Sequence, residues 1–263
     1  MGKQADMFDL TGRAALVAGG AGYLALPACL TFAEHGARVA IADGDEGRLR
    51  AAVGEVEAAA PGRVLGLPLD AADEGAIARA VARTLERFGR LDVLLSATYC
   101  SVGCAMEDLT AADFDRANRA NVTGAFLLAR AAAEAMREGG SIILYSSMYG
   151  LVAPDPAMYE APMQPNPIES SAGKGAVVQM TRYMAAHYGR RNIRVNAIAP
   201  GPFPWADMQA EHPAFIERLA RRTMLGRIGR RHETAGAALF LASDASSFVT
   251  GHVLCVDGGW TAW

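Results

Sequence analysis

A glycine-rich turn near the start of the chain contains residues that could hold a phosphate group. The stretch "AGGAGYLA", residues 18–25, follows a short apolar run and precedes a helical pattern. Gly19 can make a tight turn, and Gly22 lets backbone approach a pyrophosphate at a helix N-terminus, where N–H groups and the dipole favour anions. Ala25 is small enough for close packing of helix on strand. Because any turn from strand to helix favours glycine, this turn alone is weak evidence for a nucleotide.

An acidic residue about twenty positions further on strengthens the nucleotide interpretation. Asp43 ends the next apolar run, "ARVAIAD", where a carboxylate can accept hydrogen bonds from the hydroxyls of an adenosine ribose. The same carboxylate would repel a 2′-phosphate, so the pattern favours NAD(H) over NADP(H). Capping of the next helix is the alternative role, although Asp45 is better placed for it. Asp70, which ends the third run, fits a contact to adenine and a helix cap equally well.

These residues need a scaffold that brings the ends of strands together, and the apolar pattern predicts one. Short apolar runs predict strands at residues 14–19, 37–43, 63–70, 91–97, 141–147, 193–200 and 252–259. Stretches with helical spacing lie between them, such as 73–88, 111–136 and 175–188. Near-continuous apolar strands that alternate with helices indicate an α/β fold, a doubly wound parallel sheet of about seven strands with helices on both faces. No repeat or linker marks a boundary, so we expect a single Rossmann-type domain over residues 1–263.

The composition excludes several classes of protein. Of the 263 residues, 51% are hydrophobic and 20% are charged, which supplies enough apolar material for a core. A net charge of −3 gives no basic field for nucleic acid. Residues 14–33 carry no charge, but glycines and Pro27 interrupt them, so we expect a buried strand and helix and no contact with a membrane. The cysteines lack metal-ligand spacing, which favours reduced thiols, no metal site and a cytoplasmic location.

Longer segments resemble the short-chain dehydrogenase/reductase family over nearly the whole chain. The most specific are "NVTGAF", "SIILYSSMYG", "GKGAVVQMTRYMAAHYGRRNIRVNAIAPGPF" and "FLASDASSFVTGHVLCVDGGW". The resemblance implies hydride transfer between NAD(H) and an alcohol or carbonyl substrate, with substrate loops at about 148–170 and 202–226. It also implies a homodimer or homotetramer built through long helices and the last strand. Cofactor contacts are expected from Tyr23, Leu24, Pro200 and Gly201.

The family's catalytic residues can be carried over one position at a time. The resemblance aligns Asn121 with the asparagine that holds a helix distortion and a water of the proton relay. Ser147 takes the place of the serine that hydrogen-bonds the substrate oxygen. Lys174 takes the place of the lysine that binds the nicotinamide ribose and lowers the pKa of a catalytic tyrosine. The position of that tyrosine holds Ser170 in this chain.

A serine cannot replace the tyrosine directly. A phenol, with a pKa of about 10 that a nearby ammonium lowers, can exchange a proton with the reacting oxygen. The Ser170 hydroxyl is a far weaker acid and is too short to reach the same place. Simple loss of a general acid costs about 10²- to 10⁴-fold in rate. Two further family signatures differ, because residues 96–99 read "SATY" in place of Asn-Asn-Ala-Gly and Ala18 replaces a threonine.

Three interpretations of Ser170 remain open. Another group could supply the proton, and Tyr159 is the first candidate, although a role in the pocket wall is favoured for it; the others are Tyr99, Tyr149, Asp155, Glu160 and Glu169. NAD could stay bound for a non-redox reaction, with Lys174 as a charge stabiliser or base. The chain could also be a catalytically silent member that serves as a binding or assembly subunit. The joint retention of Asp43, Asn121, Ser147 and Lys174 argues against the silent protein, and the interpretation that we adopt is an oxidoreductase with a non-standard proton donor.

The region after the sixth predicted strand resembles the family's substrate lid. Phe203, Trp205 and Met208 could cover an apolar or ring-shaped small molecule, or equally well lie in a subunit interface. An arginine-rich stretch, residues 218–231, suggests a binding site for phosphate or carboxylate. Because acids are interspersed with these arginines on a predicted helix, a solvated face is the favoured interpretation.

Overall fold

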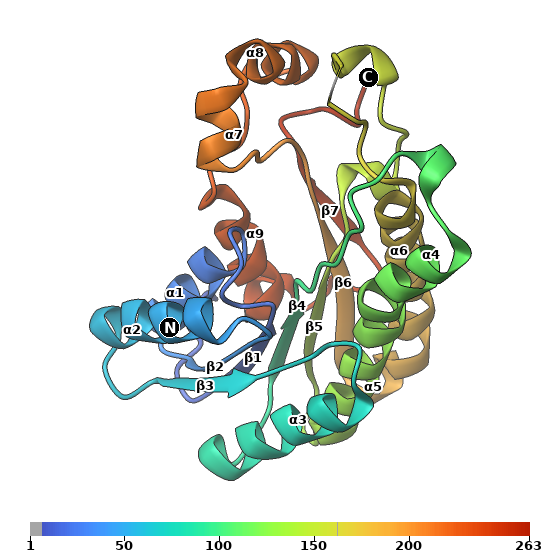
Figure 1. Cartoon of the computed structure of the whole chain (residues 1–263). Coiled ribbons are helices and arrows are strands. Elements are labelled where there is room, and N and C mark those ends of the chain that lie inside the picture. The colour runs from blue at the N-terminus through green and yellow to red at the C-terminus, as the bar shows by residue number, and fades with distance from the viewer. Residues whose placement is uncertain (1–6, 162) are drawn as a thin grey trace.

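Seven parallel strands form one sheet in the order β3-β2-β1-β4-β5-β6-β7. The computed structural model describes residues 7–161 and 163–263. Its strands are β1 (Ala14–Ala18), β2 (Arg38–Asp43), β3 (Val64–Pro68), β4 (Val93–Ser96), β5 (Gly140–Tyr145), β6 (Ile193–Pro200) and β7 (Val253–Val256). The strand order reverses between β1 and β4, which opens a crevice at the carboxyl ends of the strands. The predicted doubly wound fold is therefore confirmed (Figure 1).

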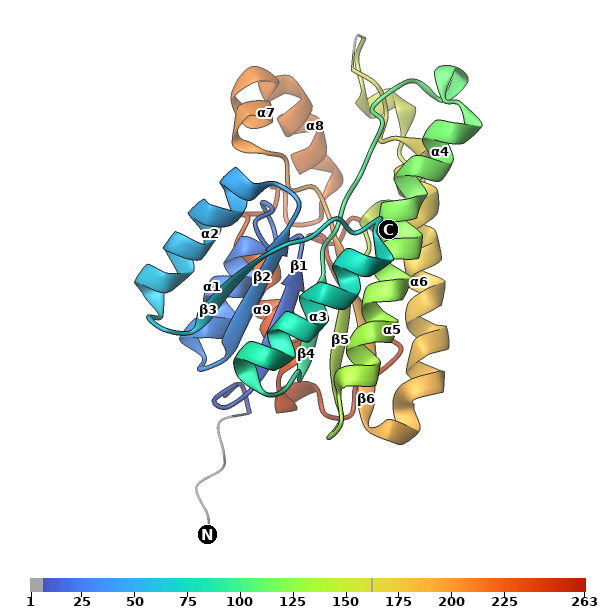
Figure 2. The ribbon, with the colours of Figure 1, turned by 60° about the horizontal axis from the view of Figure 1, so that its bottom comes forward.

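Helices cover both faces of the sheet (Figures 1 and 2). One layer holds α1 (Leu26–Glu34), α2 (Glu46–Ala59) and α9 (Glu233–Ala242). The other holds α3 (Glu74–Phe88), α4 (Ala111–Asn118), α5 (Ala125–Ala135) and α6 (Ile168–Tyr188). The short helices α7 (Ala206–Glu211) and α8 (Pro213–Arg222) stand beyond the carboxyl ends of the strands, at the top of Figure 1.

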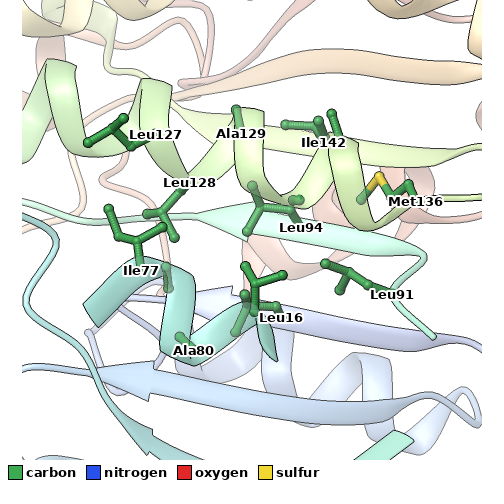
Figure 3. Packing of buried hydrophobic residues seen from close by; sticks show 14 of the residues in the cluster. Leu16, Ile77, Ala80, Leu91, Leu94, Leu127, Leu128, Ala129, Met136 and Ile142 are labelled. Carbon is green, nitrogen blue, oxygen red and sulfur yellow. The ribbon is translucent and has the colours of Figure 1, made fainter. Parts of the chain in front are cut away.

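Alternate residues along the strands pack into two separate hydrophobic cores, one on each face of the sheet. Leu16, Leu94 and Ile142 point toward α3 and α5, where they meet Ile77 and Leu128 (Figure 3). Their neighbours in the strands point to the other layer, against α1, α2 and α9. Each fully buried side chain of this size contributes about 1.5–3 kcal/mol. Because both faces of the sheet are packed, the strand ends that carry the polar residues are held rigidly.

Two predicted helices differ from those observed. The stretch predicted as one helix at 111–136 contains a π-helical segment, Arg119–Gly124, between α4 and α5. The helix predicted at 175–188 begins earlier, at Ile168, so that Ser170 and Lys174 both lie on α6. The small residues before Lys174 fit this helix because it packs closely on α4. A Cβ atom at Gly173 would lie only 2.5 Å from Asn118 Oδ1.

Several general properties concern the whole described chain. None of its helices is long and apolar enough to cross a membrane. The described residues hold no group of three or more His, Cys, Asp or Glu side chains placed to bind a metal ion. The four cysteines are unpaired, namely Cys29, Cys100, Cys104 and Cys255.

Candidate active site

The carboxyl ends of the strands open into a cleft of about 1160 Å³. The glycine turn after β1 lines it, together with Asp43 at the end of β2 and Asp70 after β3. Ser147, Ser170 and Lys174 line it as well, from the β5 and α6 side of the molecule. Residues far apart in the sequence thus share one cavity, as the order of parallel strands requires.

The glycine turn has a backbone that other residues would not tolerate. Gly19 has a φ of 71°, and a Cβ atom there would lie 2.7 Å from the carbonyl oxygen of Ala97. A Cβ atom at Gly22 would lie 3.0 Å from the carbonyl oxygen of Gly19. Helix α1 follows directly, and no side chain caps its N-terminus. The turn therefore offers bare backbone and an uncapped helix start, which suit a pyrophosphate.

Asp43, the last residue of β2, is held firmly beside this turn. Its Oδ2 accepts a hydrogen bond from the Ala21 N–H at 3.1 Å, and its Oδ1 accepts one from Asp45 N–H at 3.1 Å. A carboxylate has about four acceptor sites, so it can still accept hydrogen bonds from ribose hydroxyls. The cap of α2 is Asp45, whose side chain accepts from Arg48 N–H. Asp43 is therefore not needed as the cap of α2, and its remaining acceptor sites are available to a ligand in the cleft.

Asp70, which follows β3, also borders the cleft. Its Oδ1 accepts a hydrogen bond from Ala72 N–H at 2.8 Å, within the turn that follows β3. The cap of α3 is Asp73, so capping this helix is not the role of Asp70. One carboxylate oxygen of Asp70 makes the turn, and the other can accept a hydrogen bond from a group in the cleft.

Lys174 is a buried cation on the wall of the cleft. Only 7% of it is exposed, and Nζ donates a hydrogen bond to the carbonyl oxygen of Tyr145 at 2.8 Å. Burial lowers the pKa of Lys174 to about 8, because the uncharged amine is favoured where water is excluded. Ser170 lies one turn earlier on α6 and lines the same cleft, on the same helix face as Lys174.

Ser147 stands at the end of β5, facing the same cleft. Its Oγ accepts a hydrogen bond from Tyr149 N–H at 3.1 Å, which leaves the hydroxyl hydrogen for a partner in the cleft. The neighbouring Ser146 donates from Oγ to the carbonyl oxygen of Lys174 at 2.9 Å. This bond from Ser146 fixes the turn that carries Ser147 relative to α6 at Lys174.

Asn121 lies in the π-helical segment and is almost fully buried. Its Nδ2 donates to the carbonyl oxygen of Cys100 at 2.6 Å, and its Oδ1 accepts from Cys100 N–H at 2.8 Å. Glu169 is buried too, and its Oε1 accepts from Ser101 Oγ and Val102 N–H. Both side chains anchor the segment at residues 97–105, whose first part lines the cleft. The anchoring role of Glu169 was missed from sequence, where it was only a candidate acid.

The structure places Tyr159 outside the set of residues that line the cleft. Its hydroxyl is 2.9 Å from the hydroxyl of Tyr149, and its ring packs on Phe215. Burial raises the pKa of both tyrosines, which keeps them protonated. Asp155 caps a short turn, and Glu160 pairs with Arg218. Lys174 and Tyr159 are thus not brought together in the cleft.

The region after β6 covers part of the cleft. Trp205 stacks on Tyr23 of the glycine turn, with ring centroids 4.8 Å apart, and Arg231 lies over the Tyr23 ring. Phe203 lines the cleft, whereas Met208 packs with the cluster that contains Tyr149. The other lining residues expected from the sequence are Leu24, Pro200 and Gly201. Three arginines of the basic stretch pair with acids, namely Arg218, Arg221 and Arg227.

The lining residues that were not expected from the sequence include Arg48, Tyr145 and Asn166. Asn166 lies just before α6, and its Nδ2 donates to Ser171 Oγ at 2.9 Å. Tyr145 is 6% exposed, and burial raises the pKa of its hydroxyl to about 12. Only the tertiary structure reveals these positions, although a tyrosine within an otherwise aliphatic strand is a signal that could have drawn attention.

Known proteins resemble the chain in both sequence and structure. Residues 24–261 match the protein family described as enoyl-(acyl carrier protein) reductase. Galactitol 2-dehydrogenase (L-tagatose-forming) of Cereibacter sphaeroides is 36% identical over 263 residues, which cover 98% of each protein. Inactive 2-(S)-hydroxypropyl-CoM dehydrogenase 2 of Xanthobacter autotrophicus is 36% identical over 236 residues, 86% of this chain and 96% of the relative.

A solved structure adds the comparison of folds. The short-chain type dehydrogenase/reductase from Mycobacterium marinum superposes with a TM-score of 0.86 at 32% identity, over 98% of both chains. Its likeness extends over the sheet, the helices and the segments that form the cleft, since almost no part of either chain is left out. The chain belongs to the short-chain dehydrogenase/reductase family.

Proposed function

We propose that this protein is an oxidoreductase that transfers a hydride between NAD(H) and an alcohol or carbonyl substrate, with a non-standard proton donor. The observation that carries this proposal is a single cleft with a nucleotide-binding turn and Asp43 in one part and Ser147 and Lys174 in another. Dehydrogenases and reductases among the relatives support the same class of reaction.

The residues present fit a dinucleotide. A Cβ atom at Gly19 or Gly22 would press on a backbone oxygen atom, so glycine at both positions allows the tight turn, and the uncapped start of α1 favours the negative pyrophosphate. Asp43 would accept hydrogen bonds from the adenosine ribose and oppose a 2′-phosphate, which is why we favour NAD(H). Arg48 lies nearby, with its Nε 3.1 Å from Asp45 Oδ2 and its Nη2 4.0 Å from Asp43 Oδ1, so two carboxylates compensate its charge. Lys174 would bind the nicotinamide ribose.

The residues beside the expected nicotinamide position have different roles in the proposed reaction. When bound, the cofactor supplies or takes the hydride. The Ser147 hydroxyl would donate a hydrogen bond to the substrate oxygen and so orient the reacting carbon. Asn121 would act indirectly, by holding the segment after β4 through Cys100. Ser170 stands where family members carry tyrosine, so the proton must move through another group.

A secondary alcohol is the substrate class that we favour. Two of the relatives are named for galactitol and cyclopentanol. In this chain Phe203 and Trp205 give the open side of the cleft an apolar cover, which suits the carbon skeleton of such a substrate. The unpaired cysteines favour a reducing compartment, so we place the protein in the cytoplasm. The family resemblance favours a homo-oligomer.

A catalytically silent protein is the second candidate. The observation in its favour is the short Ser170 side chain beside Lys174, together with a relative that is named inactive. In that case the cleft would bind a nucleotide without turnover.

The two candidates can be separated with a panel of secondary alcohols and polyols, NAD⁺, and the reduced nicotinamide as readout. The matched variant is Ser170→Tyr, which adds the phenol that relatives carry. Turnover by the wild-type protein on any member of the panel supports the oxidoreductase. If only Ser170→Tyr turns over the panel, the wild-type chain is a silent member and the proposal is wrong.

A further inference from the structure

Lysine is exceptionally rare in this protein. The chain has 25 basic residues, of which only Lys3 and Lys174 are lysines. Arginine stays protonated in proteins, whereas a buried lysine can lose its proton readily. The chain therefore meets almost all of its need for positive charge with arginine, and places its one lysine after residue 3 on the wall of the cleft.

Among the described residues, a single hydrogen-bond acceptor faces the amine of Lys174. Within the described residues, Nζ has no carboxylate partner and bonds only to the carbonyl oxygen of Tyr145. Burial is the sole cause that lowers the pKa of Lys174, to about 8. A lysine retained only as a fixed charge would be better served by a nearby acid, which would raise its pKa.

The ionisable groups on the elements packed around Lys174 do not alter this state. Tyr145 at the end of β5 and Tyr149 in the turn after it are both buried, which raises their pKa values and keeps them neutral. Glu169 on the same helix is engaged by Ser101 and Val102. On α4, Arg116 pairs with Asp113. Burial thus acts on the amine unopposed.

Position 170, beside Lys174 on the cleft wall, holds a small side chain. Ser170 and Lys174 are one turn apart on α6, and both line the cleft together with Ser147. A tyrosine at position 170 would place a large ring in front of the lysine. Serine leaves that volume open on the cleft wall that Lys174 shares with Ser147.

We propose that Lys174 is the group that exchanges the proton with the substrate, in place of a phenol. This inference rests on the proposed function. In alcohol oxidation the C–H electron pair leaves as hydride to NAD⁺, the O–H bond breaks, and the C=O bond forms. The proton goes to the lone pair of Nζ, directly or through the Ser170 hydroxyl, and the resulting ammonium releases it to solvent. In carbonyl reduction the ammonium gives the proton back.

The first test measures the proton on Lys174 directly and needs no substrate. Protein labelled with ¹³C at lysine Cε should give two side-chain resonances, and the Lys3→Arg variant assigns the remaining one to Lys174. We expect that resonance to titrate with a midpoint near pH 8. A midpoint close to the ordinary lysine value of about 10.4 would overturn the proposal, because the amine would then stay charged at neutral pH.

The second test asks whether Lys174 is needed to exchange a proton or only to supply a positive charge. Lys174→Arg keeps a cation that cannot act as a base, and Lys174→Met removes it. We expect both variants to lose at least about 10²-fold in turnover. In the wild type, alcohol oxidation should rise with pH through about 8. Lys174→Arg with turnover close to that of the wild type would overturn the role of the lysine.

Cofactor binding keeps this result distinct from a failure of the proposed function. NAD⁺ affinity of each variant is measured by calorimetry beside its turnover. Lost turnover with NAD⁺ affinity retained within about tenfold, or about 1.4 kcal/mol, supports a role in proton transfer. Turnover and binding lost to the same extent would mean that Lys174 only binds the cofactor, and would contradict the proposal while leaving the oxidoreductase function intact.

Discussion

A single buried amine shows most clearly how function and stability oppose each other in this protein. Moving the ammonium of Lys174 out of water is unfavourable, and one bond to a carbonyl oxygen compensates only part of that cost. The fall in pKa from 10.5 to about 8 corresponds to about 3 kcal/mol. A residue kept at such a cost is typical of active sites, where stability is lost in favour of reactivity.

This cost predicts how stability depends on pH. Because the folded pKa is lower than the unfolded pKa, the unfolded chain binds more protons between about pH 8 and 10.5, so stability rises with pH in that window. We expect Lys174→Met to be more stable than the wild type at pH 7, by about 1–3 kcal/mol, with the difference shrinking by pH 10. Urea unfolding at the two pH values measures it. An equal difference at both would contradict the burial argument.

Tyr159 allows a second prediction at the residue scale. Since its hydroxyl bonds to Tyr149 away from the cleft lining, Tyr159→Phe should cost about 1 kcal/mol of stability through the lost hydrogen bond. Its turnover should fall by less than about threefold, far below the 10²-fold or more expected for a general acid. Thermal unfolding and steady-state rates check the two parts. A loss of turnover as large as that of Lys174→Met would restore Tyr159 as the proton donor.

At the scale of elements, the site depends on how the segment at 97–105 is held against two helices. Asn121 reaches it from the π-helical segment, and Glu169 reaches it from the first turn of α6. Neither contact belongs to regular secondary structure. The π-helical turn, which shifts the helix register by one residue, lies where Asn121 meets the Cys100 backbone.

Removing the amide should therefore loosen the cleft wall. Asn121→Ala leaves the N–H and carbonyl of Cys100 without their partner, which should cost about 2–4 kcal/mol and speed hydrogen exchange across 97–105. The matched control is Asn118→Ala, because Asn118 donates within α4, to Phe114. Exchange in 97–105 that is equally slow in both variants would show that Asn121 does not hold the segment.

The sequence predicts the strands better than the connections between them. Each of the seven predicted runs contains or overlaps a strand, because a parallel sheet buried on both faces needs nearly continuous apolar residues. The π-helical break and the early start of α6 follow from tertiary contacts, such as the close approach at Gly173. The direction of the Tyr159 side chain depends on Tyr149 and Phe215, which no local pattern encodes.

At the scale of the whole molecule, an apolar face on α5 and α6 remains open to solvent. Phe126 is 39% exposed and Tyr183 is 72% exposed, and both line a surface cavity of about 620 Å³ with Met180 and Met184. Large exposed apolar groups that gather in one place indicate an interface. The family resemblance implies pairing of subunits through long helices, so we propose a second copy of this chain as the occupant.

One substitution on this face tests the proposed interface. Tyr183→Glu puts a charge into the proposed interface, where burial without a partner is strongly unfavourable. We expect it to shift the protein toward the monomer mass in light scattering coupled to size exclusion. Glu55→Ala, on the exposed side of α2 in the other layer, is the matched control. If Tyr183→Glu keeps the wild-type mass, whatever that mass is, the face of α5 and α6 is not the interface.

Calorimetric titration of NAD⁺ and NADP⁺ into the wild-type protein and the Asp43→Ala variant tests the central claim most directly. We expect NAD⁺ to bind at least about tenfold more tightly than NADP⁺, a difference of about 1.4 kcal/mol, and Asp43→Ala to remove that preference while the protein stays folded by circular dichroism. If neither nucleotide binds the wild type, the proposed reaction has no hydride carrier. If NADP⁺ binds more tightly than NAD⁺, the assignment of Asp43 as the residue that selects NAD(H) is wrong.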